Sequence, residues 1–265
     1  MDTLAPHLLP IALVFLLAGG VKGVAGMGLP TVAMGLLGLW LMPTEAAALL
    51  ALPSLLTNLQ QAWGAGTGTL LRRLWPLLAC IIAGTWCSAG ILAGADPRLA
   101  RAGLGALLAL YAVLGLVQWQ GRLSPSQARW AAPPVGLATG LLTGATGVFV
   151  LPVLPYLVAL HLPRDTLMRA LGSCFAAATL ALAAALIAHG AFPRQALGPS
   201  LLALLPTAIG MWLGARLRER ISASAFRRVF FLTLLGLGLH QLWQAWVEDV
   251  ISPRHRSAVG RPGIP

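Results

Sequence analysis

Apolar runs long enough to cross a membrane recur along this chain from one end to the other. Three of them read LLPIALVFLLAGGV, LWPLLACIIAGTWCSAGILAGA and ARAGLGALLALYAVLGLVQW. A helix needs about 20 predominantly apolar residues to span a bilayer, and these runs approach or reach that length. Only 9% of the 265 residues are charged, whereas soluble domains carry about 25%. The sequence therefore predicts an all-α, polytopic integral membrane protein.

The chain has a net charge of +11, and its cationic residues lie mainly in the predicted loops. Arginines fall mainly between the apolar runs, which is typical of loops on the cytoplasmic side. The chain has no basic stripe interleaved with aromatic residues, so we expect no nucleic-acid partner. The N-terminus lacks a cationic region before the first run, which predicts a retained first span rather than a cleaved signal peptide. The three cysteines show no metal-ligand spacing, and we expect them to serve packing rather than a metal.

The two halves of the chain contain the same breaks, turns and short motifs in the same order. Each half has a Gly-rich break, a Pro-x-acid turn, a Gly-x-Trp sequence and a long final apolar helix. The turn reads Pro43-Thr44-Glu45 in the first half and Pro163-Arg164-Asp165 in the second. A shared order of this kind indicates two homologous transmembrane repeats, residues 1–120 and 121–265. With one residue of slack, the alignment sets Gly20, Gly23 and Gly26 opposite Gly140, Gly144 and Gly147.

Each repeat divides into five apolar segments, of which the first two are short. Segments of about 14–17 residues beside a Gly-rich break predict broken or re-entrant helices, giving 8–10 membrane segments in all. The predicted segments are 5–20, 29–42, 45–63, 75–94 and 99–118 in the first half, and 130–146, 147–161, 164–189, 197–216 and 225–247 in the second.

An odd number of crossings in each half would invert the second repeat relative to the first. If all ten segments change sides, one face collects 11 arginines, from Arg72 to Arg228, and the other face collects 6. The positive-inside bias then places both termini outside the cytoplasm, although the basic tail RHRSAVGR favours the opposite side. We therefore predict inverted repeats.

Lys22 is the only lysine of the chain and lies in GGVKGVAGMGLP, residues 19–30. Non-helical backbone at membrane depth is tolerated only inside a protein or beside water, and equivalent breaks in two repeats point to the binding site of a transporter. A half-helix that begins after such a break attracts anions through its free N–H groups. We expect such starts at Leu29-Pro30-Thr31 and after Gly147. Lys22 either completes this anion site or is a snorkelling lysine near a helix end.

Other polar residues within the spans are few. Ser54, Thr57, Asn58 and Gln61 share one helical face, which either lines a substrate path or forms interhelical hydrogen bonds. The matching stretch of the second half, SCFAAATLALAAAL, keeps only Ser173 and Thr179, so the expected site is asymmetric.

Two further polar features of the second half have alternative roles. Thr143 and Thr146 flank Gly144 and either donate to a ligand or satisfy freed carbonyls. Arg169 is either a second cation for the anion or an interfacial anchor. The sequence shows no catalytic residues, no metal ligands and no cofactor motif. The candidate substrate-binding residues are Lys22, Gly23, Gly26, Gly28, Thr31, Ser54, Thr57, Asn58, Gln61, Thr143, Gly144, Thr146, Gly147 and Ser173.

The Gly-rich segment of the second half, GLLTGATGVFVLPVLPYLVALHLPRDTLMRALGS, resembles the signature of the TauE/SafE-type sulfite exporters, the four-toluene sulfonate uptake permease family. The segment GVAGMGLPTVAMGLLGLWLMPTEAAALLALPSLLTNLQ resembles the first-half version, in which the turn precedes a T-N-x-x-Q-like stretch, here residues 57–61. The Gly-Gly-Gly run of the family is reduced to Gly26-Met27-Gly28 and replaced by Gly147-Val148-Phe149. The bulkier residues would narrow a backbone cradle, so either the substrate differs or one half is structural.

The resemblance implies a secondary transporter of small sulfur-containing anions, such as sulfite, thiosulfate, sulfoacetate or related sulfonates, in the bacterial inner membrane. Its mechanism would be alternating access by two rocking repeats, and its partners the anion and the bilayer; a homo-oligomer is compatible with the sequence. The alternative, a membrane-embedded assembly factor or enzyme subunit without transport activity, would need buried His, Asp or Glu, whereas the acids here lie at loops or ends. A passive channel would show a symmetric pore pattern, which the asymmetric repeat lacks.

Overall fold

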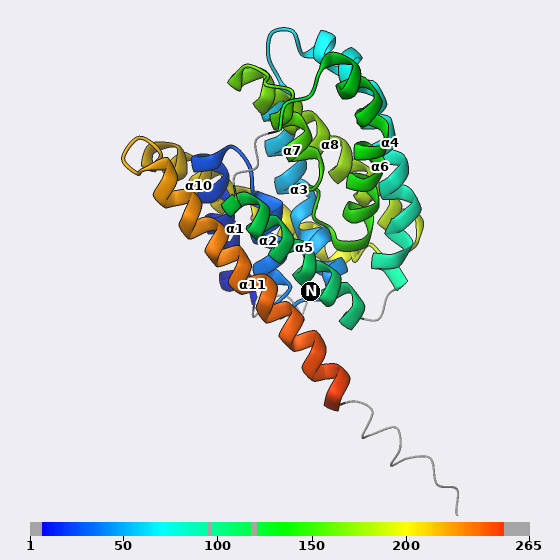
Figure 1. The fold of residues 1–265 in the computed structure, drawn as a ribbon. Helices are drawn as coiled ribbons and strands as arrows, with labels where there is room; N and C mark the ends of the chain where they lie inside the picture. The colour runs from blue at the N-terminus through cyan, green and yellow to red at the C-terminus, as the bar shows by residue number, and fades with distance from the viewer. Residues whose placement is uncertain (1–6, 95–96, 118–120, 252–265) are drawn as a thin grey trace, which may run out of the picture.

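A computed structural model of the chain describes residues 7–94, 97–117 and 121–251, and these residues are helical with no strand among them (Figure 1). The all-helical prediction is therefore confirmed. The basic tail used above to weigh the orientation, with Arg254, Arg256 and Arg261, lies outside the described residues, as does Asp96.

In each half the second helix, α2 or α7, is short and lies between two longer helices. The first half contains α1 (Leu8–Ala25), α2 (Leu29–Leu37), α3 (Pro43–Ala62), α4 (Thr67–Gly94) and α5 (Pro97–Val117). The second half contains α6 (Pro125–Thr146), α7 (Val153–Ala159), α8 (Arg164–Ala188), the 3-10 turn η2 (Arg194–Ala196), α9 (Leu197–Leu202), α10 (Leu204–Leu217) and α11 (Ala223–Ile251).

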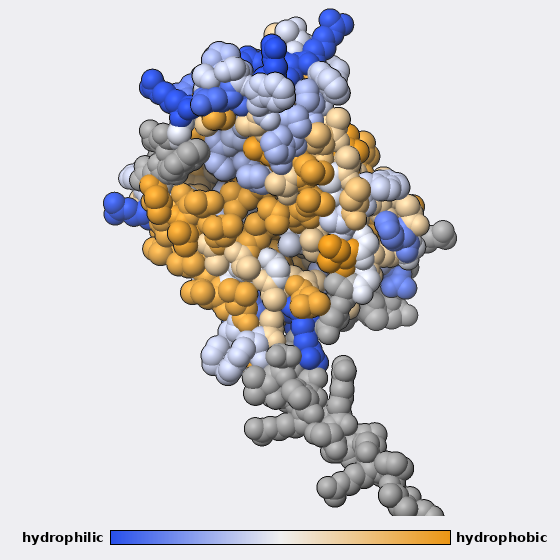
Figure 2. Space-filling view, turned by 45° about the vertical axis from the view of Figure 1, so that its right-hand side comes forward, coloured by the Kyte–Doolittle hydropathy of each residue, from blue (hydrophilic) through white to orange (hydrophobic). Residues whose placement is uncertain are grey.

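The surface of the bundle is apolar where a membrane would surround it. Figure 2 shows a hydrophobic band across the middle of the molecule and hydrophilic residues gathered at its top. Tryptophans near helix ends face outward, among them Trp63 at the end of α3 and Trp130 in the first turns of α6, as in the aromatic belts of membrane proteins. Five stretches of the described chain are long and apolar enough to span a bilayer: Leu8–Ala25, Thr67–Gly94, Arg98–Val117, Arg164–Ala188 and Leu197–Leu217. The chain is a multi-pass membrane protein.

Helix α1 is longer than the predicted segment 5–20, because most glycines of its end are helical. Gly19 and Gly23 lie against the backbone of α10: a Cβ atom at Gly23 would approach the Met211 carbonyl oxygen to 2.2 Å. Small residues at this spacing let two membrane helices approach closely. The glycine-rich break predicted at 19–30 is thus confined to Gly26–Gly28.

Helix α6 packs on α4 in the same manner. Gly136, Gly140 and Gly144 follow one another at every fourth residue, and a Cβ at Gly140 would lie 2.3 Å from the Ile81 carbonyl oxygen. Figure 1 shows α4, α6 and α8 gathered on one side of the molecule and α1, α10 and α11 on the other.

Both α1 and α6 end at a glycine in the left-handed conformation. Gly26 has φ 76° and Gly147 has φ 74°, and each donates its N–H to the carbonyl four residues earlier, a common helix ending that glycine adopts without strain. With these two caps aligned, Gly23 falls opposite Gly144, and Gly19 rather than the predicted Gly20 falls opposite Gly140.

The second break differs from the prediction because apolar side chains fill it. Helix α7 begins at Val153 instead of directly after Gly147, and the intervening Val148, Phe149 and Val150 are buried. The Phe149 ring packs on Phe175 with centroids 5.2 Å apart. The predicted segment 197–216 is also interrupted, at Ala203 between α9 and α10.

The residue pairs in contact show the relative directions of the helices. Helices α3 and α8 are antiparallel, with Ser54 beside Thr179 and Gln61 beside Met168; α5 and α11 are antiparallel as well, since Gly105 meets Gly238 and Gly115 meets Phe231. By contrast, α1 runs parallel to α10 and α4 parallel to α6. These directions bring one set of helix ends together, which we call the arginine-rich end; it carries Arg72, Arg73, Arg129, Arg164, Arg216, Arg227 and Arg228.

The cysteines follow the packing prediction only in part. Cys174 is buried in α8 and Cys80 is half-buried, whereas Cys87 is exposed on the outer side of α4. The prediction is wrong for Cys87.

We expect Gly140→Ala to destabilise the α4–α6 contact by about 1–3 kcal/mol, because the new methyl group meets backbone rather than a movable side chain. Gly236→Ala in α11 is the matched control, since a Cβ there meets nothing within 4 Å and alanine favours a helix by up to about 1 kcal/mol. Thermal unfolding in detergent, followed by near-ultraviolet circular dichroism, distinguishes them; equal unfolding temperatures would contradict the glycine packing described here.

Candidate functional site

Lys22 points from α1 into the bundle rather than toward a headgroup region. Its side chain is only 3% exposed. The ammonium donates to Thr57 Oγ1 at 3.0 Å and to Asn58 Oδ1, both on α3. A snorkelling lysine would extend along the surface to reach polar headgroups. The observed geometry is that of an interior cation.

The hydrogen bonds continue from α3 to α8. Asn58 Nδ2 donates to Ser54 Oγ at 3.0 Å, and the Ser54 and Thr179 hydroxyls are 3.1 Å apart. We call these five residues, Lys22, Ser54, Thr57, Asn58 and Thr179, the Lys22 network. It joins three helices that are far apart in the sequence and lies within the bundle, because all five side chains are buried.

Local helix geometry positions the Lys22 ammonium and leaves one of its N–H groups without a hydrogen bond to Thr57 or Asn58. Lys22 occupies the last turn of α1, where the helix dipole favours a cation. The Thr57 hydroxyl donates its proton to the Pro53 carbonyl at 2.7 Å, so its lone pairs are available to Lys22. An ammonium has three N–H donors, and two are used here. Among the described residues no carboxylate pairs with it, and no three His, Cys, Asp or Glu side chains gather as a metal site.

Helix α2 begins where the sequence predicts, and its first turn holds a polar group without a partner. Gly28 caps the helix with φ 98°, which favours glycine, and Pro30 occupies the first turn. Thr31 is fully buried, and its hydroxyl has no hydrogen-bond partner in the described part of the chain. A buried hydroxyl without a partner costs about 1–3 kcal/mol, so a ligand that accepts from Thr31 would recover that free energy.

Gly26, Gln61 and Ser173 lie where α8 meets the ends of α1 and α3. A Cβ at Gly26 would lie 2.6 Å from Met168 Sδ, and Gln61 Nε2 donates to the Met168 carbonyl at 3.0 Å. Ser173 donates to its own helix, at the Arg169 carbonyl. Arg169 donates to the Ala65 carbonyl after α3, which is the contact of an anchor. Gly23 packs on α10, as described above.

The second-half candidates are not brought to the Lys22 network by their nearest contacts. Thr143 and Thr146 donate to the Thr139 and Leu142 carbonyls, each at 2.7 Å. These carbonyls lie within α6 rather than at the break. Gly144 packs on α4, and a Cβ at Gly147 would lie 2.7 Å from the Met34 methyl group. With the two glycine caps aligned, Thr143 occupies the position that Lys22 holds in the first half.

A pocket of about 510 Å³ reaches the far end of the Lys22 network. It lies between α3, α8 and α9, away from the arginine-rich end, and its lining includes Leu55, Thr179, Ile187 and Phe192. Thr179 is thus both a pocket wall and a hydrogen-bond partner of Ser54. Thr179 is a visible polar residue of its segment in the sequence, but it is not among the predicted candidates. No periodicity in the sequence predicts that Phe192 lines the same pocket.

Removing an acceptor from Lys22 is expected to destabilise the protein more than removing Lys22 itself. Asn58→Leu leaves a buried ammonium short of a partner and should cost about 3–5 kcal/mol, whereas Lys22→Met replaces a buried charge with an apolar chain of similar length. The double variant should therefore lose less stability than the two single losses combined. Thermal unfolding of the four proteins in detergent measures this; additive losses would mean that Lys22 and Asn58 do not interact.

Comparison with known proteins identifies the chain at the level of its family. A family model described as Sulfite exporter TauE/SafE matches residues 11–240, which include most of α1, all of α2 to α10, the Lys22 network and most of α11. No curated protein and no solved structure matches the chain. Because the match covers most of its length, the chain belongs to the TauE/SafE sulfite exporter family, a family of membrane transporters.

Proposed function

We propose that this protein is a secondary transporter of small anions, namely sulfite or a related sulfur-containing anion, and that the Lys22 network is its binding site. The observation that carries the proposal is the buried Lys22 ammonium, whose only partners among the described residues are the neutral Thr57 and Asn58. A cation inside a membrane protein is costly unless it is paired or hydrated. A transported anion would supply the missing charge.

The donors around Lys22 suit an oxyanion. The third N–H of the ammonium and the second N–H of the Asn58 amide are free of the bonds described above. Both can donate to oxygens of the same ligand, and a hydrogen bond between ions is about twice as strong as a neutral one. A cationic substrate would be repelled by the same ammonium. We propose no enzymatic role, in keeping with a family of transporters.

Alternating access by two inverted repeats is the mechanism we propose for the transport. Support comes from the helix directions: α3 and α8, which hold equivalent positions in the two halves, are antiparallel, and so are α5 and α11. A two-fold axis in the membrane plane would produce this relation. The pocket beside Thr179 offers a route from one side, and rocking of the halves would open the other.

A single anion site in the first half is the arrangement we favour. Thr143 stands where the first half has Lys22, and Phe149 fills the space beside the second break. The second half would then bind no anion, and its movement relative to the first half would open the site and release the anion. This assigns Gly144, Thr146 and Gly147 to helix packing and capping, and Lys22, Ser54, Thr57 and Asn58 to the anion.

Transport of radiolabelled sulfite into proteoliposomes tests the function. We expect Lys22→Met to lower the saturable flux about tenfold or more, because a charge-assisted hydrogen bond contributes roughly 1.5–3 kcal/mol. Arg228→Gln is the matched control, since it removes a cation from an exposed position. Thiosulfate and sulfoacetate serve as competitors. Equal flux in the wild type and Lys22→Met would exclude Lys22 from the site, and no flux with any of the three anions would contradict the substrate class.

Labelling by a membrane-impermeant thiol reagent tests the orientation in the bacterial inner membrane. In a background of Cys80→Ala, Cys87→Ala and Cys174→Ala, single cysteines replace exposed residues at both ends of the bundle. We expect Gln195→Cys to react from the periplasmic side and Ser126→Cys and Ser222→Cys, at the arginine-rich end, to react only after the membrane is opened. The reverse pattern would contradict the proposed orientation.

A further inference from the structure

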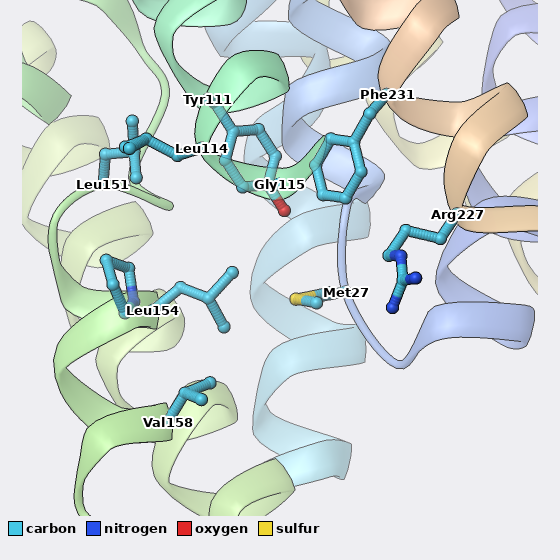
Figure 3. A pocket seen from close by; sticks show the side chains of 10 residues that line it. Met27, Tyr111, Leu114, Gly115, Leu151, Leu154, Val158, Arg227 and Phe231 are labelled. Carbon is cyan, nitrogen blue, oxygen red and sulfur yellow. The ribbon is translucent and has the colours of Figure 1, made fainter. Parts of the chain in front are cut away.

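A second pocket, separate from the Lys22 network, lies where the first glycine break meets α5, α7 and α11. Its volume is about 290 Å³, close to the lower limit of about 300 Å³ for small-molecule sites. Figure 3 shows Met27 entering it from the break, Leu154 and Val158 from α7, and Tyr111 and Arg227 from α5 and α11. None of its lining residues belongs to the Lys22 network.

Tyr111 presents a buried hydroxyl to this pocket. The residue is 2% exposed, and its hydroxyl has no hydrogen-bond partner among the residues that the structure describes. Figure 3 shows the oxygen directed into the pocket. Edge contacts of the ring with Phe230 and Phe231, at 6.4 and 5.2 Å between centroids, hold it in this direction. A buried tyrosine hydroxyl usually has a partner, so its direction points to a ligand that accepts from it.

Arg227 supplies a charge to the same pocket. It lies in the second turn of α11 at the arginine-rich end and forms no hydrogen bond or ion pair with any described residue. In Figure 3 its guanidinium lies at the edge of the pocket. The next residue, Arg228, is exposed and does not line the pocket. One cation and one hydroxyl therefore face a space whose other walls are apolar.

We propose that this pocket binds an amphipathic anion, with a single acidic headgroup on a short hydrocarbon body. The headgroup would pair with Arg227 and accept from the Tyr111 hydroxyl, and the body would lie against Leu114, Leu154 and Val158. A hydrophilic dianion would leave the apolar walls unused, and a neutral hydrocarbon would leave Tyr111 and Arg227 unpaired. The ligand is either a free organic anion from water or the anionic end of a membrane lipid. The site does not depend on transport through the Lys22 network.

Calorimetric titration of 1-hexanesulfonate tests the pocket, with the protein in phosphatidylcholine nanodiscs and empty nanodiscs as the blank. We expect saturable binding that weakens about tenfold or more in Arg227→Gln and about threefold in Tyr111→Phe. Arg228→Gln, which removes an exposed arginine outside the pocket, should bind as the wild type does. Tyr111→Phe should also unfold at the same or a higher temperature without ligand, because it removes an unsatisfied buried hydroxyl, so weaker binding in this variant is not a folding defect.

Adding phosphatidylglycerol to the nanodiscs distinguishes the two sources. If the natural ligand is a lipid, the anionic lipid weakens hexanesulfonate binding, and native mass spectrometry finds phosphatidylglycerol retained by the wild type and lost from Arg227→Gln. If the ligand comes from water, the lipid has no effect. The proposal would be overturned if hexanol bound as tightly as hexanesulfonate. Equal binding of hexanesulfonate by the wild type and Arg227→Gln would also overturn it, as would loss of hexanesulfonate binding in Lys22→Met but not in Arg227→Gln.

Discussion

The hydrogen bonds from the Lys22 ammonium to α3 are the interaction on which the arrangement of the bundle depends. An ammonium inside a membrane protein must find acceptors, and Thr57 and Asn58 are the ones that α3 provides. This requirement fixes the rotation of α1, since Gly19 and Gly23 must face α10 on another side of the same helix. A helix held on two faces cannot turn without losing either the close glycine contact or the partners of its charge.

The polar network then sets how the two halves meet. Ser54 and Thr179 join α3 to α8 where these helices run antiparallel, and in a bundle whose other contacts are mostly apolar such bonds help to fix the axial register of two helices. The first half therefore contributes both the charge and most of the polar groups around it. The second half contributes Thr179 and otherwise apolar packing, including Phe149 against Phe175.

The apolar runs were enough to predict the fold class, and a charge among them was enough to find Lys22. The helix boundaries were less predictable, because a glycine that allows close helix contact looks the same in sequence as one that ends a helix. Gly23 is the first kind and Gly26 the second, and only the position of α10 separates them. The shared polar face of α3 was visible in the sequence, but its hydrogen bonds to Lys22 were not, because only the folded chain brings α1 beside α3. Tyr111 and Arg227 lie in ordinary segments of two distant helices, so only the folded chain shows that they share a pocket.

The glycine caps of α1 and α6 are each covered by a methionine from the other half: Met168 of α8 lies on Gly26, and Met34 of α2 lies on Gly147. The two covers form an interlock, because sliding the halves past each other displaces both methionines together. Since methionine is unbranched and adaptable, each side chain can stay in contact with the glycine beneath it through a small displacement of either half.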